Sequence, residues 1–120
     1  MEAGKRVLIV EDETVSALAL EKMLTNIGFA VVKIVATGED SIASAKAERP
    51  DIIVMDIRLA GKMDGIEAAS AIIAELSIPI VFMTGYDDAT VKNRAMRLKP
   101  LGYVLKPIDL QKMKSAFGIS

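Results

Sequence analysis

Five short runs of mostly apolar residues recur along the chain, and none shows the strict alternation of a strand with one solvated face. Runs of this length that are rich in valine and isoleucine are typical of strands buried on both faces of a parallel sheet. The pattern therefore predicts five strands, at residues 6–10, 30–36, 52–55, 80–83 and 102–105.

The segments between these runs space their apolar residues by three and four, which is the spacing of one helix face. Two such faces consist of Leu20, Leu24 and Ile27, and of Ile66, Ala69, Ile73 and Leu76. Gly28 and Pro50 are typical of helix ends, and Thr37 is suited to cap a helix start. We predict five helices, at residues 14–27, 38–49, 65–76, 88–98 and 109–117.

Strands that alternate with helices predict a doubly wound α/β fold, because each helix carries the chain back across a parallel sheet. The sequence contains no internal repeat, linker or low-complexity segment. We therefore expect a single domain that fills residues 1–120, with a five-stranded parallel sheet.

Composition narrows the possible chemistry. The formal net charge is -1, so we expect no general attraction to nucleic acid or to anionic membranes. The chain has neither cysteine nor histidine, which excludes thiol catalysis, imidazole metal ligands and phosphorylation of a histidine within it. Its apolar runs are shorter than a membrane helix needs, and its start lacks a signal-peptide core. We expect a soluble, cytoplasmic protein.

Polar side chains follow the predicted strands at the positions where ligands bind in such folds, beyond the carboxyl ends of the strands. They are Glu11 and Asp12 after the first strand, Asp56 after the third, Thr84 after the fourth and Lys106 after the fifth. Carboxylates brought together in this way repel one another and need a cation. Mg²⁺ binds through carboxylate oxygens and bridges to phosphate, and an aspartate can itself accept a phosphoryl group.

Four segments, taken in order, resemble the receiver domain of response regulators in two-component signalling. They are "VLIVEDE", "IVMDIRLAGKMDGIEA", "IPIVFMTGY" and "GYVLKPID", and the resemblance covers about residues 5–117. It implies a flavodoxin-like (βα)5 fold and a signalling module rather than an enzyme. It also implies a histidine kinase or histidine phosphotransfer protein as phosphoryl donor, and an output partner that this sequence does not identify.

By the same resemblance, Asp56 is the phosphoacceptor, and its carboxylate shares a Mg²⁺ ion with Glu11 and Asp12. The backbone carbonyl of Arg58 would complete the protein ligands of the metal. Lys106 would pair with the phosphoryl group, and the peptide bond between Lys106 and the following proline would be cis.

Thr84 and Tyr103 match the two switch residues of the family: a hydroxyl that turns toward the phosphoryl group, and an aromatic ring that repacks with it. Phosphorylation would then shift the surface formed by the fourth helix, the fifth strand and the fifth helix. This surface is the one expected to control the output partner.

Three features depart from the family pattern. Glu11 stands where aspartate is commoner, and the loop "RLAGKMDG" lacks the usual "MP" and is one residue longer. Arg58 and Tyr86 lie two residues after Asp56 and Thr84, at positions that tune hydrolysis of the aspartyl phosphate in the family. Two bulky side chains at these positions favour slow hydrolysis, because they would shield the phosphoryl group from water.

Two other functions remain open at this point. One is a receiver-like docking module that works without phosphorylation, which the unusual Glu11 leaves possible. The other is a Mg²⁺-dependent phosphohydrolase, but such enzymes usually carry a second acid two residues after the nucleophile, where this chain has Arg58. Purely local roles are also available, such as a turn cap for Asp56 and a helix-dipole role for Glu11 and Asp12.

Overall fold

A computed structural model of the chain describes residues 4–119. Its strands are β1 (Arg6–Val10), β2 (Ala30–Val35), β3 (Ile52–Asp56), β4 (Ile80–Thr84) and β5 (Gly102–Leu105). Its helices are α1 (Thr14–Asn26), α2 (Gly38–Glu48), α3 (Gly65–Glu75), α4 (Ala89–Met96) and α5 (Leu110–Ala116). The predicted alternation of five strands with five helices is confirmed.

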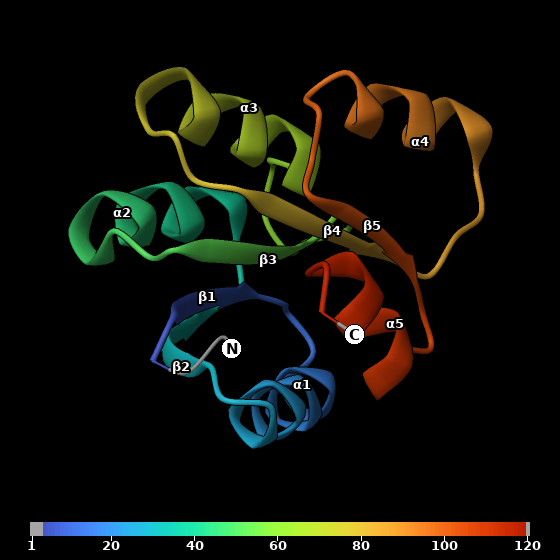
Figure 1. The fold of residues 1–120 in the computed structure, drawn as a ribbon. Helices are drawn as coiled ribbons and strands as arrows, with labels where there is room; N and C mark the ends of the chain where they lie inside the picture. The colour runs from blue at the N-terminus through green and yellow to red at the C-terminus, as the bar shows by residue number, and fades with distance from the viewer. Residues whose placement is uncertain (1–3, 120) are drawn as a thin grey trace.

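All strand pairs are parallel, and the strands lie in the order β2-β1-β3-β4-β5. This is the flavodoxin-like order. The strand β2 lies on one side of β1, whereas β3, β4 and β5 follow on the other side, so the topological switch point lies between β1 and β3. Helices α1 and α5 cover one side of the sheet, and α2, α3 and α4 cover the other (Figure 1). The predicted doubly wound fold is therefore confirmed.

The three central strands are buried almost throughout, because side chains from both of their faces pack into one of two apolar clusters. Residues such as Leu8 and Phe82 point toward α2, α3 and α4, whereas Ile9 and Met83 point toward α1 and α5. The edge strand β2 is only partly buried, which accounts for the lysine in its apolar run. No helix of the described part of the chain is long and apolar enough to span a membrane.

Two local predictions need correction. The third and fourth strands include Asp56 and Thr84 as their last residues, so both side chains are fixed by the sheet rather than by a loop. The buried stripe of α3 runs through Ile66, Ala69 and Ile72, whereas Ile73 is 38% exposed. The helix face that packs on the sheet consists of positions 66, 69 and 72 and the small residues beside them. Ile73 points away from this face.

Gly65 holds the start of α3 directly against the end of β3. Its backbone N–H donates to the carbonyl of Ile57 at 2.7 Å, and a Cβ on Gly65 would lie only 2.1 Å from the backbone carbonyl oxygen of Asp56. No side chain fits at that distance, so the position of Asp56 depends on a glycine here.

We predict that Gly65→Ala lowers the free energy of unfolding by about 1–3 kcal/mol, because β3 and α3 must move apart to admit the methyl group. Gly85→Ala is a matched control, since a Cβ there meets nothing within 4 Å. Urea unfolding followed by circular dichroism measures both variants. Equal stability of the two would contradict the close approach at Gly65.

Candidate functional site

The carboxyl ends of β1 and β3 bring two acids together inside the protein. Glu11 directly follows β1 and Asp56 ends β3, and each residue is only 4% exposed. Asp12, the next residue after Glu11, is exposed at the mouth of the site. One carboxylate oxygen from each of these three acids lies within 4.8 Å of the others. The predicted clustering of Glu11, Asp12 and Asp56 is present.

Lys106, which follows β5, supplies the cation that the buried acids require. Its Nζ donates to Asp56 Oδ2 and to Glu11 Oε1, both at 2.7 Å. Burial lowers the pKa of Lys106, but the hydrogen bonds and charges of Asp56 and Glu11 outweigh that effect, and the net pKa is raised. Lys106 is therefore held as an ammonium between the two carboxylates. The peptide bond that follows it, to Pro107, is cis.

The remaining oxygens of the two buried carboxylates accept hydrogen bonds from nearby backbone. The N–H of Arg58 donates to Asp56 Oδ1 at 3.2 Å, and the N–H of Glu13 donates to Glu11 Oε2 at 3.2 Å. These bonds fix how both carboxylates are oriented. They also place the backbone of Arg58 beside Asp56, where the sequence predicts a metal-ligating carbonyl.

The donor set fits a hard divalent cation. Three carboxylates share the site with one ammonium, which leaves two negative charges without a counter-ion. All the candidate ligand atoms are oxygens, as Mg²⁺ prefers, and the exposed carboxylate of Asp12 leaves one side open to water. The arrangement is consistent with the Mg²⁺ site that the sequence predicts.

Thr84 is buried at the end of β4, and its Oγ accepts a hydrogen bond from the backbone N–H of Tyr86 at 3.3 Å. Its backbone carbonyl accepts the N–H of Lys106 at 2.8 Å, which ties the end of β4 to the residue that contacts Asp56. Thr84 therefore sits on the same sheet edge as the three acids, as expected.

Tyr103 lies apart from the acids, on the edge strand β5. Its hydroxyl oxygen is buried and has no hydrogen-bond partner among the described residues. Burial, followed by the charges of Asp87 and Asp88, raises the pKa of this phenol. The Nζ of Lys92, on α4, lies 5.6 Å from the centroid of the ring. The ring is thus packed between β5 and α4 with its polar atom unsatisfied.

Arg58 and Tyr86 are in contact with each other across the mouth of the site. The guanidinium carbon of Arg58 lies 4.1 Å from the centroid of the Tyr86 ring, within the range of a cation–π interaction. Both residues line an open cavity of about 280 Å³ together with Asp56 and Lys106. The sequence pointed to each of them separately, but nothing in it indicated that they stack.

Another group was missed at the sequence level. Asp64 caps α3 by accepting the N–H of Glu67, whose carboxylate in turn accepts the N–H of Asp64. The other oxygen of Asp64 is 3.2 Å from Arg94 of α4. The pattern of an aspartate with a glutamate three residues later was the available signal for the capping box. No local signal predicted the pair with Arg94.

Known proteins share this fold and this order of motifs. The family model described as "Response regulator receiver domain" matches residues 7–117. Transcriptional regulatory protein PdtaR of Mycobacterium tuberculosis is 30% identical over 116 residues, which cover 97% of this chain and 56% of that protein. This chain spans about half the length of the curated relatives that it matches.

Solved structures of receiver domains have the same fold as this chain. The signal receiver domain of a modulated diguanylate cyclase from Desulfovibrio desulfuricans G20 superposes with a TM-score of 0.88 at 35% identity, covering 96% of this chain and 91% of that one. A chain in the CheX–CheY–BeF3–Mg²⁺ complex from Borrelia burgdorferi gives a TM-score of 0.86 at 25% identity, covering 96% and 90%. The chain therefore belongs to the response regulator receiver domain family, and it is a two-component signalling module rather than an enzyme.

Proposed function

We propose that this chain accepts a phosphoryl group on Asp56 from a histidine of a partner protein, either a kinase or a phosphotransfer protein. The observation that carries the proposal is the buried pair of Asp56 and Glu11 bridged by Lys106, with Asp12 beside it. A structural ion pair would need no third acid. These 120 residues contain no histidine, so the donor histidine must lie outside them.

The transfer is a displacement at phosphorus. An oxygen of the Asp56 carboxylate forms a new P–O bond, and the P–N bond to the donor histidine breaks. The imidazole nitrogen leaves with the electron pair of that bond and takes no proton from this chain. Mg²⁺ held by Glu11, Asp12, Asp56 and the carbonyl of Arg58 would supply positive charge at the phosphoryl oxygens. The residues of the chain do the rest by positioning the acceptor and neutralising charge.

Phosphorylation would change the partners of Lys106 and Thr84. The phosphoryl group adds about two negative charges and three acceptor oxygens at pH 7. Lys106 already lies against Asp56, so its ammonium can shift to a phosphoryl oxygen without leaving the site. In its hydrogen bond with Tyr86 the Thr84 hydroxyl acts as an acceptor, so its proton can be donated to the same group.

These new contacts would bias a two-state equilibrium of the surface formed by α4, β5 and α5. Thr84 pairs with Leu105 across the β4–β5 ladder, and Tyr103 lies two residues before Leu105. The Tyr103 hydroxyl has no hydrogen-bond partner among the described residues, so a position of the ring that gives it one would gain a hydrogen bond. Through this surface a cytoplasmic output partner would respond to the state of Asp56.

We predict that the intact mass of the protein increases by one phosphoryl group after incubation with acetyl phosphate and Mg²⁺. Chelating Mg²⁺ and the variant Asp56→Asn should each abolish the adduct, because one removes the charge compensation and the other removes the nucleophile. No adduct on the wild type would favour phosphorylation-independent docking. Donor turnover without a lasting adduct would indicate hydrolase activity.

We further predict that the aspartyl phosphate hydrolyses slowly, because the stacked Arg58 and Tyr86 at the mouth of the cavity would hinder the approach of water to Asp56. Arg58→Ala and Tyr86→Ala should each shorten its lifetime severalfold, as followed by intact mass over time. Lys62→Ala, an exposed change in the same loop, should leave it unaltered. A wild-type lifetime of only seconds would argue against the shielding.

Lys106→Met should lower the free energy of unfolding by about 1–3 kcal/mol, because it leaves two buried carboxylates without a counter-ion. Mg²⁺ should restore more stability to this variant than to the wild type, since metal and ammonium neutralise the same charges. Urea unfolding with and without Mg²⁺ tests this, with Lys62→Met as control. Unchanged stability of Lys106→Met would contradict the neutralising role.

A further inference from the structure

The ammonium of Lys106 has to reach two carboxylates at once. Its Nζ lies 2.7 Å from Asp56 Oδ2 and 2.7 Å from Glu11 Oε1. Lysine carries its charge on a flexible aliphatic stem, so the position of the ammonium depends on how firmly the backbone beneath it is held. A misplacement of about 1 Å can slow a reaction about a hundredfold. The contacts that hold the backbone of Lys106 therefore affect the chemistry of the site.

The peptide group before Lys106 is hydrogen-bonded at both ends. Its N–H, which belongs to Lys106, donates to the carbonyl of Thr84 at 2.8 Å, and its carbonyl, which belongs to Leu105, accepts from Lys112 Nζ at 3.2 Å. The peptide group after Lys106 has no N–H to donate, because its nitrogen belongs to Pro107. The carbonyl of Pro107 accepts from the same Lys112 Nζ at 3.0 Å. One ammonium thus binds the backbone on both sides of Lys106.

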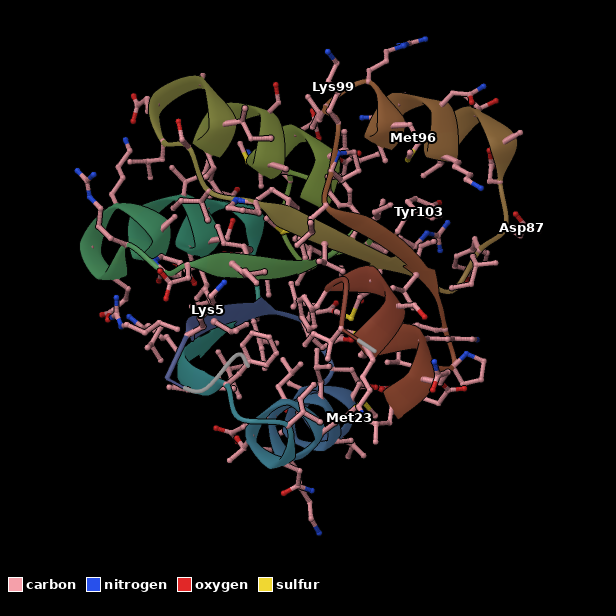
Figure 2. All side chains as sticks on the ribbon, viewed as in Figure 1. Lys5, Met23, Asp87, Met96, Lys99 and Tyr103 are labelled. Atoms are coloured by element: carbon pink, nitrogen blue, oxygen red, sulfur yellow. The ribbon has the colours of Figure 1, made fainter. Side chains whose placement is uncertain are left out.

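Lys112 is placed over this segment by the way in which α5 packs on β5. A Cβ on Gly102 would lie 2.8 Å from the Cβ of Ala116, so the end of the helix is in direct contact with the start of the strand. The first turn of α5 therefore lies beside the segment that joins the two elements (Figure 1). Asp109, the N-cap of α5, accepts the backbone N–H of Lys112 at 2.8 Å. The ring of Tyr103 lies on the other side of β5, toward α4 (Figure 2).

A role within α5 alone does not explain where the Lys112 side chain points. A cation in the first turn of a helix gains nothing from the helix dipole, because that end of the dipole is positive. Lys112 is exposed, and within residues 4–119 its ammonium forms no ion pair with a carboxylate. It is directed instead at two carbonyl oxygens, and these two flank Lys106.

We propose that Lys112 is a positioning residue for the reaction at Asp56, because it holds the backbone on both sides of Lys106 and so fixes the Lys106 ammonium against the two buried carboxylates. Lys112 acts through Lys106 and not on the reacting atoms. The kinetic part of this inference rests on the proposed function, since it concerns the rate at which Asp56 accepts a phosphoryl group. Its structural part, the coupling of Lys112 to Lys106, does not depend on that function.

The test is a double-mutant cycle of four proteins: the wild type, Lys112→Met, Lys106→Met and the double variant. Methionine keeps an unbranched aliphatic side chain and removes the ammonium. Intact mass over time gives the rate of phosphorylation by acetyl phosphate in the presence of Mg²⁺, and urea unfolding gives the stability. If Lys112 acts through Lys106, the loss of both residues slows the reaction little more than the loss of Lys106 alone, whereas independent roles multiply.

Three further variants separate this role from others. Lys112→Arg keeps hydrogen-bond donors that can reach the same carbonyls, so it should rescue the rate. Lys114→Met removes an ammonium from the same helix and controls for charge. Asp109→Ala removes the N-cap of α5 and leaves the Lys112 side chain in place, so it controls for the stability of the helix.

We expect Lys112→Met to slow phosphorylation about tenfold in the wild-type background and less than about twofold in the Lys106→Met background. Lys112→Arg should stay within about threefold of the wild type, and Lys114→Met and Asp109→Ala within about twofold. An unchanged rate in Lys112→Met, an equal slowing in both backgrounds, or an equal slowing by Asp109→Ala would overturn the positioning role.

The urea measurements keep this proposal apart from the proposed function. Lys112→Met should lower the unfolding midpoint more in the wild-type background than in the Lys106→Met background, because only the former has the two buried contacts that a fixed backbone supports. A wild type that shows this coupling but forms no adduct loses only the phosphoryl-transfer proposal. A wild type that forms the adduct but shows no coupling loses only the positioning proposal. The same comparison decides the outcome if Lys106→Met reacts too slowly to be timed.

Discussion

The bridge from Lys106 to Glu11 and Asp56 is the contact on which the site depends. Burying a carboxylate away from water costs on the order of several kcal/mol, even after the surrounding protein relaxes. Two such groups at the ends of β1 and β3 are tolerated because an ammonium from the end of β5 reaches both at 2.7 Å. One hydrogen-bonded cation thus ties together three strands that lie far apart in the sequence, and it requires the strand order that brings their ends to one edge.

The same contact leaves the site incompletely neutralised. Lys106 compensates one of the three carboxylates gathered there, and both buried ones are oriented by backbone N–H groups from the residues that follow them. Because its carboxylates are already oriented and not fully neutralised, the site is preorganised for a cation and needs little rearrangement to bind one. A metal ion and a phosphoryl group bound there would share this charge balance with Lys106, so that a change in one would shift the contacts of the others. Under the proposed function, phosphorylation of Asp56 would in this way act on the position of β5.

Much of the architecture could be predicted from the sequence, because buried parallel strands and amphipathic helices leave different patterns. The strand ends then located Glu11, Asp12, Asp56, Thr84 and Lys106 on one edge. The limits appeared where a contact joins distant segments. The stack of Arg58 on Tyr86 and the pair of Arg94 with Asp64 depend on how segments that follow different strands meet, and no periodicity encodes that. The burial of Ile72 rather than Ile73 was missed because two neighbouring isoleucines fit a helix face almost equally well.

Net charge is a poor guide to the partners of this chain, and the reason is geometric. A total of -1 predicts little attraction to any polyanion, yet it is the sum of an acidic part that contains the carboxylate cluster and a basic part around α4 and α5. Beyond roughly 10 Å at moderate salt, exposed charges hardly feel one another, so an approaching partner senses the local patch and not the sum. The carboxylate cluster at the ends of β1 and β3 attracts cations, whereas the exposed Lys92, Arg97 and Lys99 on and just after α4 attract anionic groups.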